Sequence, residues 1–313
     1  MGVNTVGAGF ATGSDTIATL AITGGTTTVS TGFSMGAQNS ALNAATAVNT
    51  ATSTLNISAG SLILSGSVSL TMGSTTLDVN NAATATINLT GTGLLRVGGN
   101  ITSAIFAGST VTNTVNLDGG TLDMDAGNLG ATATPVVLNA KSGTLMNAAL
   151  INTTDGLTKT TTGVLILSGT TNGWTGDTVF AVNGGTIRLG SGTAIPNGTG
   201  KGNLVTTNGV VDLNGYSETV NGLAGTGTVD NLAASTTSTL TVGDANTAST
   251  FSGTLQNTGT GSVLTLSKIG TGALTLATAN TYTGGTSLTA GSILINNASA
   301  LGTGPVTVSS TGV

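Results

Sequence analysis

The clearest strand pattern in the chain lies at 268–308, KIGTGALTLATANTYTGGTSLTAGSILINNASALGTGPVTV. It contains three short apolar runs, at 274–276, 293–295 and 306–308, and each run is closed within a few residues by Gly, Asn or Thr. Residues at i and i+2 of an extended chain point to the same face, so each run presents two apolar side chains to one side. The runs are too short for helices and therefore predict strands joined by tight turns.

A weaker copy of the same order begins at Lys159. The Lys-x-x-x-Gly spacing of 159–163 recurs at 268–272, and Trp174 precedes Thr-Gly at nearly the same offset as Tyr282. Both copies contain alternating apolar residues after the glycine. The positions predicted to face the interior are Leu165, Leu167, Leu274, Leu276, Ile293 and Ile295.

The order of these pieces resembles the autotransporter-associated β-strand repeat, which occurs in the secreted passenger regions of bacterial autotransporters and of related very large surface proteins. The resemblance covers 159–308, with repeat-like units at 159–190 and 268–308, and the segment 213–229 is similar to the part between repeats in that family. The resemblance implies a right-handed parallel β-helix at a cell surface. By itself it implies no chemistry.

The composition fits a folded chain with few charges. Of 313 residues, 50 are Gly and 5% are charged, about a fifth of the usual share. A hydrophobic fraction of 38% is enough for a thin, long core, and disorder normally combines low hydrophobicity with high net charge. The net charge of −5 argues against nucleic-acid binding. Without Cys there are no disulfides, which suits a passenger that crosses the outer membrane unfolded, as the resemblance implies.

The two ends of the chain and its interior differ in pattern. Residues 1–53 are predicted to be an irregular N-terminal coil, cap or assembly segment. Short strand-like pieces occur at 17, 20–22 and 28–29, whereas 34–53 is rich in Ala and Asn and poor in Gly. From 54 to 313 the alternation is steady and predicts a parallel β-helix with coils of about 20–25 residues.

No signal peptide is recognised, and no apolar run approaches the length of a membrane span. The chain stops inside an expected coil, which favours a segment of something longer.

The corners explain the composition. Gly supplies positive φ and Asn tolerates it, so both are expected at tight bends. Stacked coils place like residues above one another, so Asn and Thr are expected to form hydrogen-bonded ladders, whereas stacked charges would repel. This gives a physical reason for the small number of charges.

Catalysis is the main alternative, because many parallel β-helices cleave polysaccharides with converging carboxylates. The closest acid pair is Asp123 and Asp125, which could bind a cation weakly, although a solvated face or a turn is the expected role. Triads and most zinc sites are excluded because His and Cys are absent. The sequence thus predicts no catalytic, cofactor or metal residue. Asx-turn roles are expected for Asp177, Asp212, Asp230 and Asp244.

The residues shared by the two copies have structural interpretations. Lys159 and Lys268 are expected to hydrogen-bond a backbone carbonyl at a corner. An exposed Trp174 or Tyr282 could stack on a sugar, but packing over a coil corner is the favoured role.

Threonine suggests one further surface. Flat Thr-x-Thr arrays on β-solenoids resemble the ice-binding surfaces of some antifreeze proteins. The pairs Thr84/Thr86, Thr112/Thr114 and Thr132/Thr134 are present, but they do not recur at one fixed period, which argues against such a surface.

The sequence therefore predicts an all-β chain, a right-handed parallel β-helix (β-solenoid) forming a single elongated domain. The predicted function is a non-catalytic, extracellular structural or adhesion protein, either a surface stalk or a filament subunit. The alternative is a carbohydrate-binding or carbohydrate-cleaving β-helix. The expected partners are further copies, stacked head to tail because both ends lack charges, and host-surface or matrix glycans. Nucleic acid and membrane insertion are not expected.

Overall fold

The computed structural model describes residues 16–38, 49–75, 81–105, 107–152, 155–180 and 185–309. In these ranges the regular elements are β-strands and there is no helix, which confirms the predicted all-β class. Consequently, no described segment is a helix long and apolar enough to cross a membrane. The chain forms two compact units, unit 1 (Met1–Thr154) and unit 2 (Asp155–Val313), where the sequence predicted a single domain.

The strands of unit 1 are long. They are β1 (Thr16–Val29), β2 (Phe33–Gln38), β3 (Asn49–Leu64), β4 (Leu70–Thr75), β5 (Asn81–Thr90), β6 (Leu94–Val97), β7 (Ile101–Ala104), β8 (Thr110–Asp123), β9 (Asn128–Leu129), β10 (Val137–Met146) and β11 (Leu150–Ile151).

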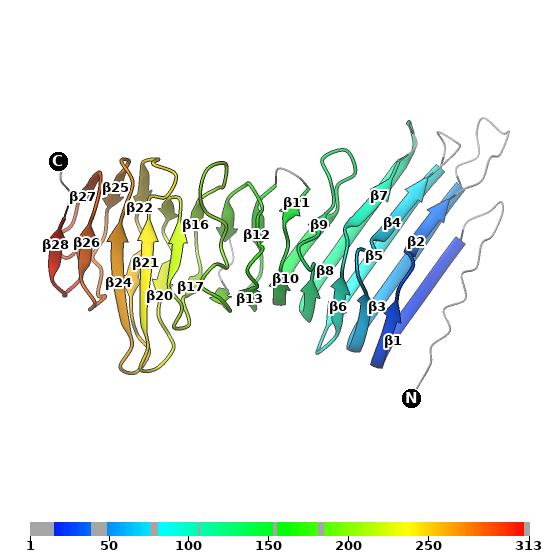
Figure 1. Cartoon of the computed structure of the whole chain (residues 1–313), viewed down its shortest axis with the longest axis horizontal. Coiled ribbons are helices and arrows are strands. Elements are labelled where there is room, and N and C mark those ends of the chain that lie inside the picture. Colours follow the sequence, from blue (N-terminus) through cyan, green and yellow to red (C-terminus); the bar gives the residue numbers. More distant parts are fainter. Residues whose placement is uncertain are drawn as a thin grey trace. The chain divides into compact units, whose positions relative to one another are not determined.

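Unit 1 has two parallel walls. Figure 1 shows the long wall, in which β1 pairs with β3, β3 with both β5 and β6, these two with β8, and β8 with β10. The short wall runs β2–β4–β7–β9–β11. The step from one long-wall strand to the next shortens along the chain. Successive pairs join Thr16 to Ala51, Asn49 to Asn81, Ala82 to Thr110 and Thr114 to Val137.

The strands of unit 2 are short. They are β12 (Leu157–Lys159), β13 (Val164–Ser168), β14 (Thr178–Phe180), β15 (Thr186–Leu189), β16 (Leu204–Thr206), β17 (Val210–Asp212), β18 (Glu218–Val220), β19 (Leu223–Gly225), β20 (Thr228–Asp230), β21 (Thr237–Val242), β22 (Ser249–Phe251), β23 (Thr254–Gln256), β24 (Val263–Lys268), β25 (Ala273–Leu276), β26 (Thr286–Leu288), β27 (Ser292–Ile295) and β28 (Val306–Val308).

Unit 2 has three parallel walls. They run β12–β14–β16–β19–β22–β25–β27, β13–β15–β17–β20–β23 and β18–β21–β24–β26–β28. The number of residues between paired positions on neighbouring strands varies. The smaller separations resemble that between Val210 and Thr228, and the larger ones resemble that between Thr178 and Leu204. Each strand thus pairs with one that lies one coil further along the chain, as in a β-solenoid. The predicted coil size of about 20–25 residues fits unit 2 but is too small for the first coils of unit 1.

The core is a column of apolar side chains at alternate strand positions. Of the predicted interior positions, Leu165, Leu167, Leu274 and Leu276 are fully buried. Ile293 is half-buried, and the prediction for Ile295 is wrong, because its side chain is 51% exposed. β27 pairs with β25 on one side, and no described strand of unit 2 covers its other side.

The segment 1–53 is not irregular over its described part, although the strand-like pieces predicted at 17, 20–22 and 28–29 are confirmed as strand. Residues 16–29 form a strand that pairs in parallel with β3, and 33–38 form β2. The proposed boundary at 53/54 falls inside β3, since that strand begins at Asn49. Residues 1–15 and 39–48 lie outside the described residues.

Candidate functional site

The two repeat copies have the same local register. In the first copy Leu157 pairs with Thr178, and in the second Leu266 pairs with Thr286. The strand that carries the lysine therefore stacks on the strand that follows the aromatic residue, one coil later. Each copy spans a little more than one coil and includes the contact between a coil and its successor.

The repeat lysines hold the corners, as predicted. The Lys159 ammonium donates to the Thr161 carbonyl oxygen at 2.6 Å. Lys268 donates to the carbonyl oxygens of Ile269 and Gly270, the latter at 2.8 Å, and to that of Ala290 on the next coil at 3.3 Å. Both side chains are buried, and burial lowers the pKa of Lys268. Donors this well buried need acceptors, and corner carbonyls supply them.

A glycine lies beside the first lysine for a steric reason. Gly185 has φ +97°, and a Cβ there would lie 2.2 Å from the Thr161 carbonyl oxygen and 3.0 Å from Lys159 Nζ. Any side chain would therefore collide with the backbone that accepts the lysine's hydrogen bond.

The repeat aromatics pack inside the corners and do not form a sugar platform. Trp174 and Tyr282 are almost fully buried, which confirms the favoured interpretation. Trp174 Nε1 donates to Thr178 Oγ1 at 2.9 Å, and the Tyr282 hydroxyl bonds Thr286 Oγ1 at 2.5 Å. Burial raises the pKa of Tyr282. The threonine four residues after each aromatic belongs to the repeat pattern in the sequence, but no role was predicted for it.

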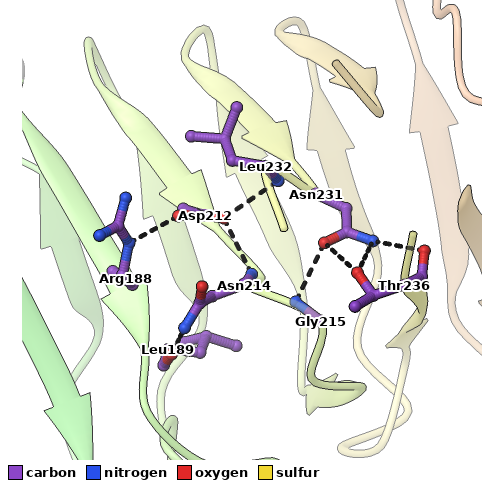
Figure 2. A network of polar contacts seen from close by, with 8 residues as sticks. All are labelled: Arg188, Leu189, Asp212, Asn214, Gly215, Asn231, Leu232 and Thr236. Carbon is purple, nitrogen blue, oxygen red and sulfur yellow. Dashed lines mark hydrogen bonds and ion pairs between the residues drawn. The ribbon is translucent and has the colours of Figure 1, made fainter. Parts of the chain in front are cut away.

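A ladder of polar residues crosses four successive strands of unit 2. The ladder is Arg188 on β15, Asp212 on β17, Asp230 on β20 and Gln256 on β23, each paired in register with the next. Figure 2 shows the part around Asp212, whose buried carboxylate accepts from Arg188 Nε at 2.7 Å. Its Oδ1 accepts from the backbone amides of Asn214 (2.8 Å) and Leu232 (3.2 Å).

Asp230 is satisfied without a cation. Its carboxylate accepts from Gln256 Nε2 at 2.8 Å, and from the Thr258 hydroxyl at 2.7 Å and amide at 2.8 Å. Two stacked carboxylates would repel in an apolar interior, so these donors and Arg188 are what make the pair tolerable. The predicted Asx-turn role is seen for Asp212. The hydrogen bonds that Asp212 and Asp230 accept from the following coil were not predicted.

Asparagine extends the network over further coils, as Figure 2 also shows. Asn231 Oδ1 accepts from the Gly215 amide at 3.0 Å, and its Nδ2 donates to the carbonyl oxygens of Thr236 (3.2 Å) and Val263 (3.1 Å). Asn214 Nδ2 donates to the Leu189 carbonyl oxygen at 3.0 Å. The corners of adjacent coils are thus joined by side-chain amides.

Unit 1 carries the predicted asparagine ladder in continuous form. Asn88 Nδ2 donates to Asn56 Oδ1 at 2.7 Å, Asn116 to Asn88 at 2.8 Å, and Asn139 to Asn116 at 2.7 Å. The amides therefore donate in one direction, from each coil to the preceding one.

The acid pair Asp123/Asp125 forms salt bridges with the side chain of Arg96. Arg96 lies 3.0 Å from Asp125 Oδ2 and 3.6 Å from Asp123 Oδ2. Asp123 Oδ1 also accepts from the Asp125 amide at 3.0 Å, which is the turn interpretation. Among the described residues, no three acids, histidines or cysteines come together as a metal site would require.

The other predicted acids lie apart from one another. Asp177 Oδ1 accepts from the Asn203 amide at 2.7 Å, and Asp244 lies exposed in the turn after β21. Of the threonine pairs, Thr84/Thr86 lie on β5 and Thr112/Thr114 on β8. The pair Thr132/Thr134 lies in the turn closed by the bridge between Ala131 and Thr134.

Glu218 is a buried acid that sequence reasoning missed. It begins β18 between polar neighbours, so nothing in its local pattern indicates burial. Its carboxylate accepts from the Ala194 amide at 3.0 Å and its own neighbour's amide, Thr219, at 3.2 Å. Desolvation by burial raises the pKa of Glu218 from 4.5 to about 7, although the backbone hydrogen bonds oppose the shift.

The comparisons with known proteins agree with the repeat. A family model described as the passenger-associated-transport-repeat matches residues 157–189 and 266–295. This confirms the resemblance predicted from sequence at both segments, although the second match ends before 308 and the two together cover well under half of the chain. Searches of curated proteins and of solved structures each found no significant match.

Proposed function

We propose that the chain is a right-handed parallel β-helix that serves outside the cell as a non-catalytic structural element of a passenger-like surface protein. The parallel walls and the two repeat matches support the winding and the location. A stack of coils can hold other parts of a protein away from the cell, and that is the role proposed for this chain.

The observation that carries the proposal is how the buried polar side chains are used. Lys268, Asp212 and Asp230 each bond to backbone or side chains of the neighbouring coil. A polysaccharide-cleaving enzyme of this fold needs carboxylates that converge on a groove and remain available to the substrate. In the described part of the chain, the close acid pairs instead use their oxygens to join coils or to hold an arginine.

A substrate screen tests the non-catalytic part of the proposal. The whole chain is incubated with polyuronates and with neutral glycans, and release of reducing ends or of unsaturated products is measured. The expected result is no turnover. Turnover that disappears in Asp123→Asn or Asp125→Asn, with the circular dichroism spectrum unchanged, would establish the carbohydrate-cleaving alternative.

A surface-display experiment tests the location. The chain is fused between a secretion signal and a membrane anchor in a Gram-negative host, and intact cells are treated with protease. Accessible chain at the surface is the expected result. Retention inside the cell, under conditions in which a known passenger is displayed, contradicts it.

A further inference from the structure

Three Thr-x-Thr pairs lie in register on successive strands of unit 1. They are Thr52/Thr54 on β3, Thr84/Thr86 on β5 and Thr112/Thr114 on β8. The step from 52 to 84 is longer than the step from 84 to 112. The unequal spacing in the sequence argued against an ordered threonine surface. In the structure, the connections between the strands differ in length and the threonines on the paired strands stay in register. The pair Thr132/Thr134 is not part of the array.

The array faces outward. The residues between the threonines, Ser53, Ala85 and Asn113, are buried, so the alternation places the threonines on the opposite face. Thr52, Thr84 and Thr112 are exposed and form an outer column, whereas Thr54, Thr86 and Thr114 are half-buried and form an inner column. Thr19 on β1 pairs with Thr54 and extends the inner column by one coil.

The spacing of this surface is regular in two directions. Neighbouring strands lie about 4.8 Å apart, and alternate residues along a strand lie about 6.7 Å apart. The asparagine ladder runs as a third column beside the inner threonines, since Asn56, Asn88 and Asn116 each follow a threonine by two residues. Its side-chain hydrogen bonds between coils hold the strands at a fixed separation.

The chemistry of the array is uniform. None of the seven threonine hydroxyls has a hydrogen-bond partner among the described residues, and the two threonine columns contain no charged or aromatic side chain. Each threonine presents one methyl group and one free hydroxyl. Such a surface orders nearby water around the methyl groups and can donate and accept hydrogen bonds at repeated positions.

We infer that this face of unit 1, made by Thr19 and the three threonine pairs, binds the surface of ice. An ice face repeats hydroxyl-like donors and acceptors in two dimensions at spacings similar to those of the array. A charged group would hold its own hydration shell against such a lattice, and the array has none. A glycan surface is a poorer match, because the columns lack the aromatic rings that pack against sugars. The inference is independent of the structural role proposed above.

Ice-affinity partitioning tests the inference. The purified whole chain is mixed with a non-binding protein of similar size, and ice is grown slowly from the solution. We expect the chain to be enriched in the ice fraction, and we expect single ice crystals grown in its presence to develop facets. A chain that is excluded from ice as fully as the non-binding protein overturns the inference.

Two variants localise the effect. Thr84→Lys, at the centre of the outer column, is expected to reduce the ice-bound fraction to that of the excluded protein, and Thr112→Lys on the next strand is expected to do the same. Thr250→Lys, at an exposed strand position of β22 in unit 2, is the matched control and is expected to retain binding. Circular dichroism verifies that each variant is folded.

Three outcomes contradict the assignment. Folded Thr84→Lys and Thr112→Lys that both remain in the ice fraction place the binding elsewhere. Equal loss in Thr250→Lys indicates a general effect of added charge. Retention on crystalline cellulose without enrichment in ice makes the face a glycan-binding surface instead.

Discussion

At the scale of single residues, burial in this chain depends on which coil lies next to a side chain as well as on the local alternation. Leu276 and Ile295 are paired directly in the register of β25 and β27. Both occupy positions of the same kind in sequence, yet Leu276 is fully buried and Ile295 is 51% exposed.

This difference gives a matched pair of substitutions. Leu276→Asp places an unpaired carboxylate in the core and is expected to cost several kcal/mol of the free energy of unfolding. Ile295→Asp introduces the same group at an exposed position, where we expect a cost of less than about 1 kcal/mol. Urea unfolding followed by circular dichroism measures both. Equal losses in the two variants would show that Ile295 is buried in solution.

Glu218 makes a second prediction at this scale. Because burial raises its pKa from 4.5 to about 7, the folded state binds the proton more tightly than the unfolded chain does. Its contribution to stability is therefore complete below pH 4.5 and is lost as the pH rises to about 7. The loss is at most about 3 to 4 kcal/mol, since one pKa unit corresponds to about 1.4 kcal/mol.

The measurement is the free energy of unfolding of the wild type minus that of Glu218→Gln, taken from pH 4 to pH 8. The difference should fall as the pH rises through this window and become level above it, because the glutamine does not titrate. A difference that stays constant with pH would mean that Glu218 is solvated in the folded chain.

At the scale of elements, neighbouring strands are joined by side chains as well as by backbone. The clearest example is the asparagine ladder on β3, β5, β8 and β10, in which the interior amides both donate and accept along the column. Chains of hydrogen bonds polarise one another, so an interior member of the ladder contributes more than an end member.

Asn88→Ala and Asn139→Ala test this difference. Asn88 makes two ladder bonds and Asn139 makes one. A net hydrogen bond contributes about 1 kcal/mol, so we expect losses of about 2 and about 1 kcal/mol in the free energy of unfolding. Unfolding in urea measures them. A larger loss for Asn139→Ala than for Asn88→Ala would contradict a continuous ladder.

Many of the strands and of the side-chain contacts between them could be predicted from the sequence. Alternation at 274–276 indicated the strand and its inward face, and the composition indicated amide ladders in place of charges. The role of Lys268 also followed from its place before a corner. What could not be predicted depends on register between coils. The partner of Glu218 at Ala194, or of Thr84 at Thr52, lies a whole coil away along the chain, and the coils have no fixed length.

The same limit explains two wrong predictions. Residues 16–29 pair with β3 across a coil longer than the expected length of about 20–25 residues, so their strand-like pieces could not be placed in the stack from sequence. Ile295 is exposed because no strand among the described residues of unit 2 covers it. The alternation within β27 alone cannot predict whether such a strand is present.

At the scale of the whole molecule, the last described coil of unit 2 presents an apolar surface. Leu294, Ile295, Val306 and Val308 on β27 and β28 are each at least half exposed. A parallel strand edge with exposed apolar residues recruits further strands unless something covers it. We propose that in the isolated chain a second copy packs against this coil, and a contact of this head-to-tail kind does not close on itself.

Light scattering at increasing concentration tests this self-association, with electron microscopy of the same samples. We expect mass to grow with concentration, and we expect Leu294→Lys combined with Val306→Lys to keep the chain monomeric. Val164→Lys, at another exposed apolar strand position, is the control and should associate as the wild type does. A wild type that stays monomeric at high concentration excludes head-to-tail assembly.

The progressive shortening of the steps in unit 1 has a consequence for how such a chain can change over generations. A residue gained or lost at a corner alters the circumference of one coil and leaves the facing strands aligned. The register between the strands of neighbouring coils is therefore kept. Insertions and deletions should therefore accumulate at turns such as 66–67, while the walls keep their length. A lineage built in this way can lengthen, shorten or duplicate single coils without designing a new core.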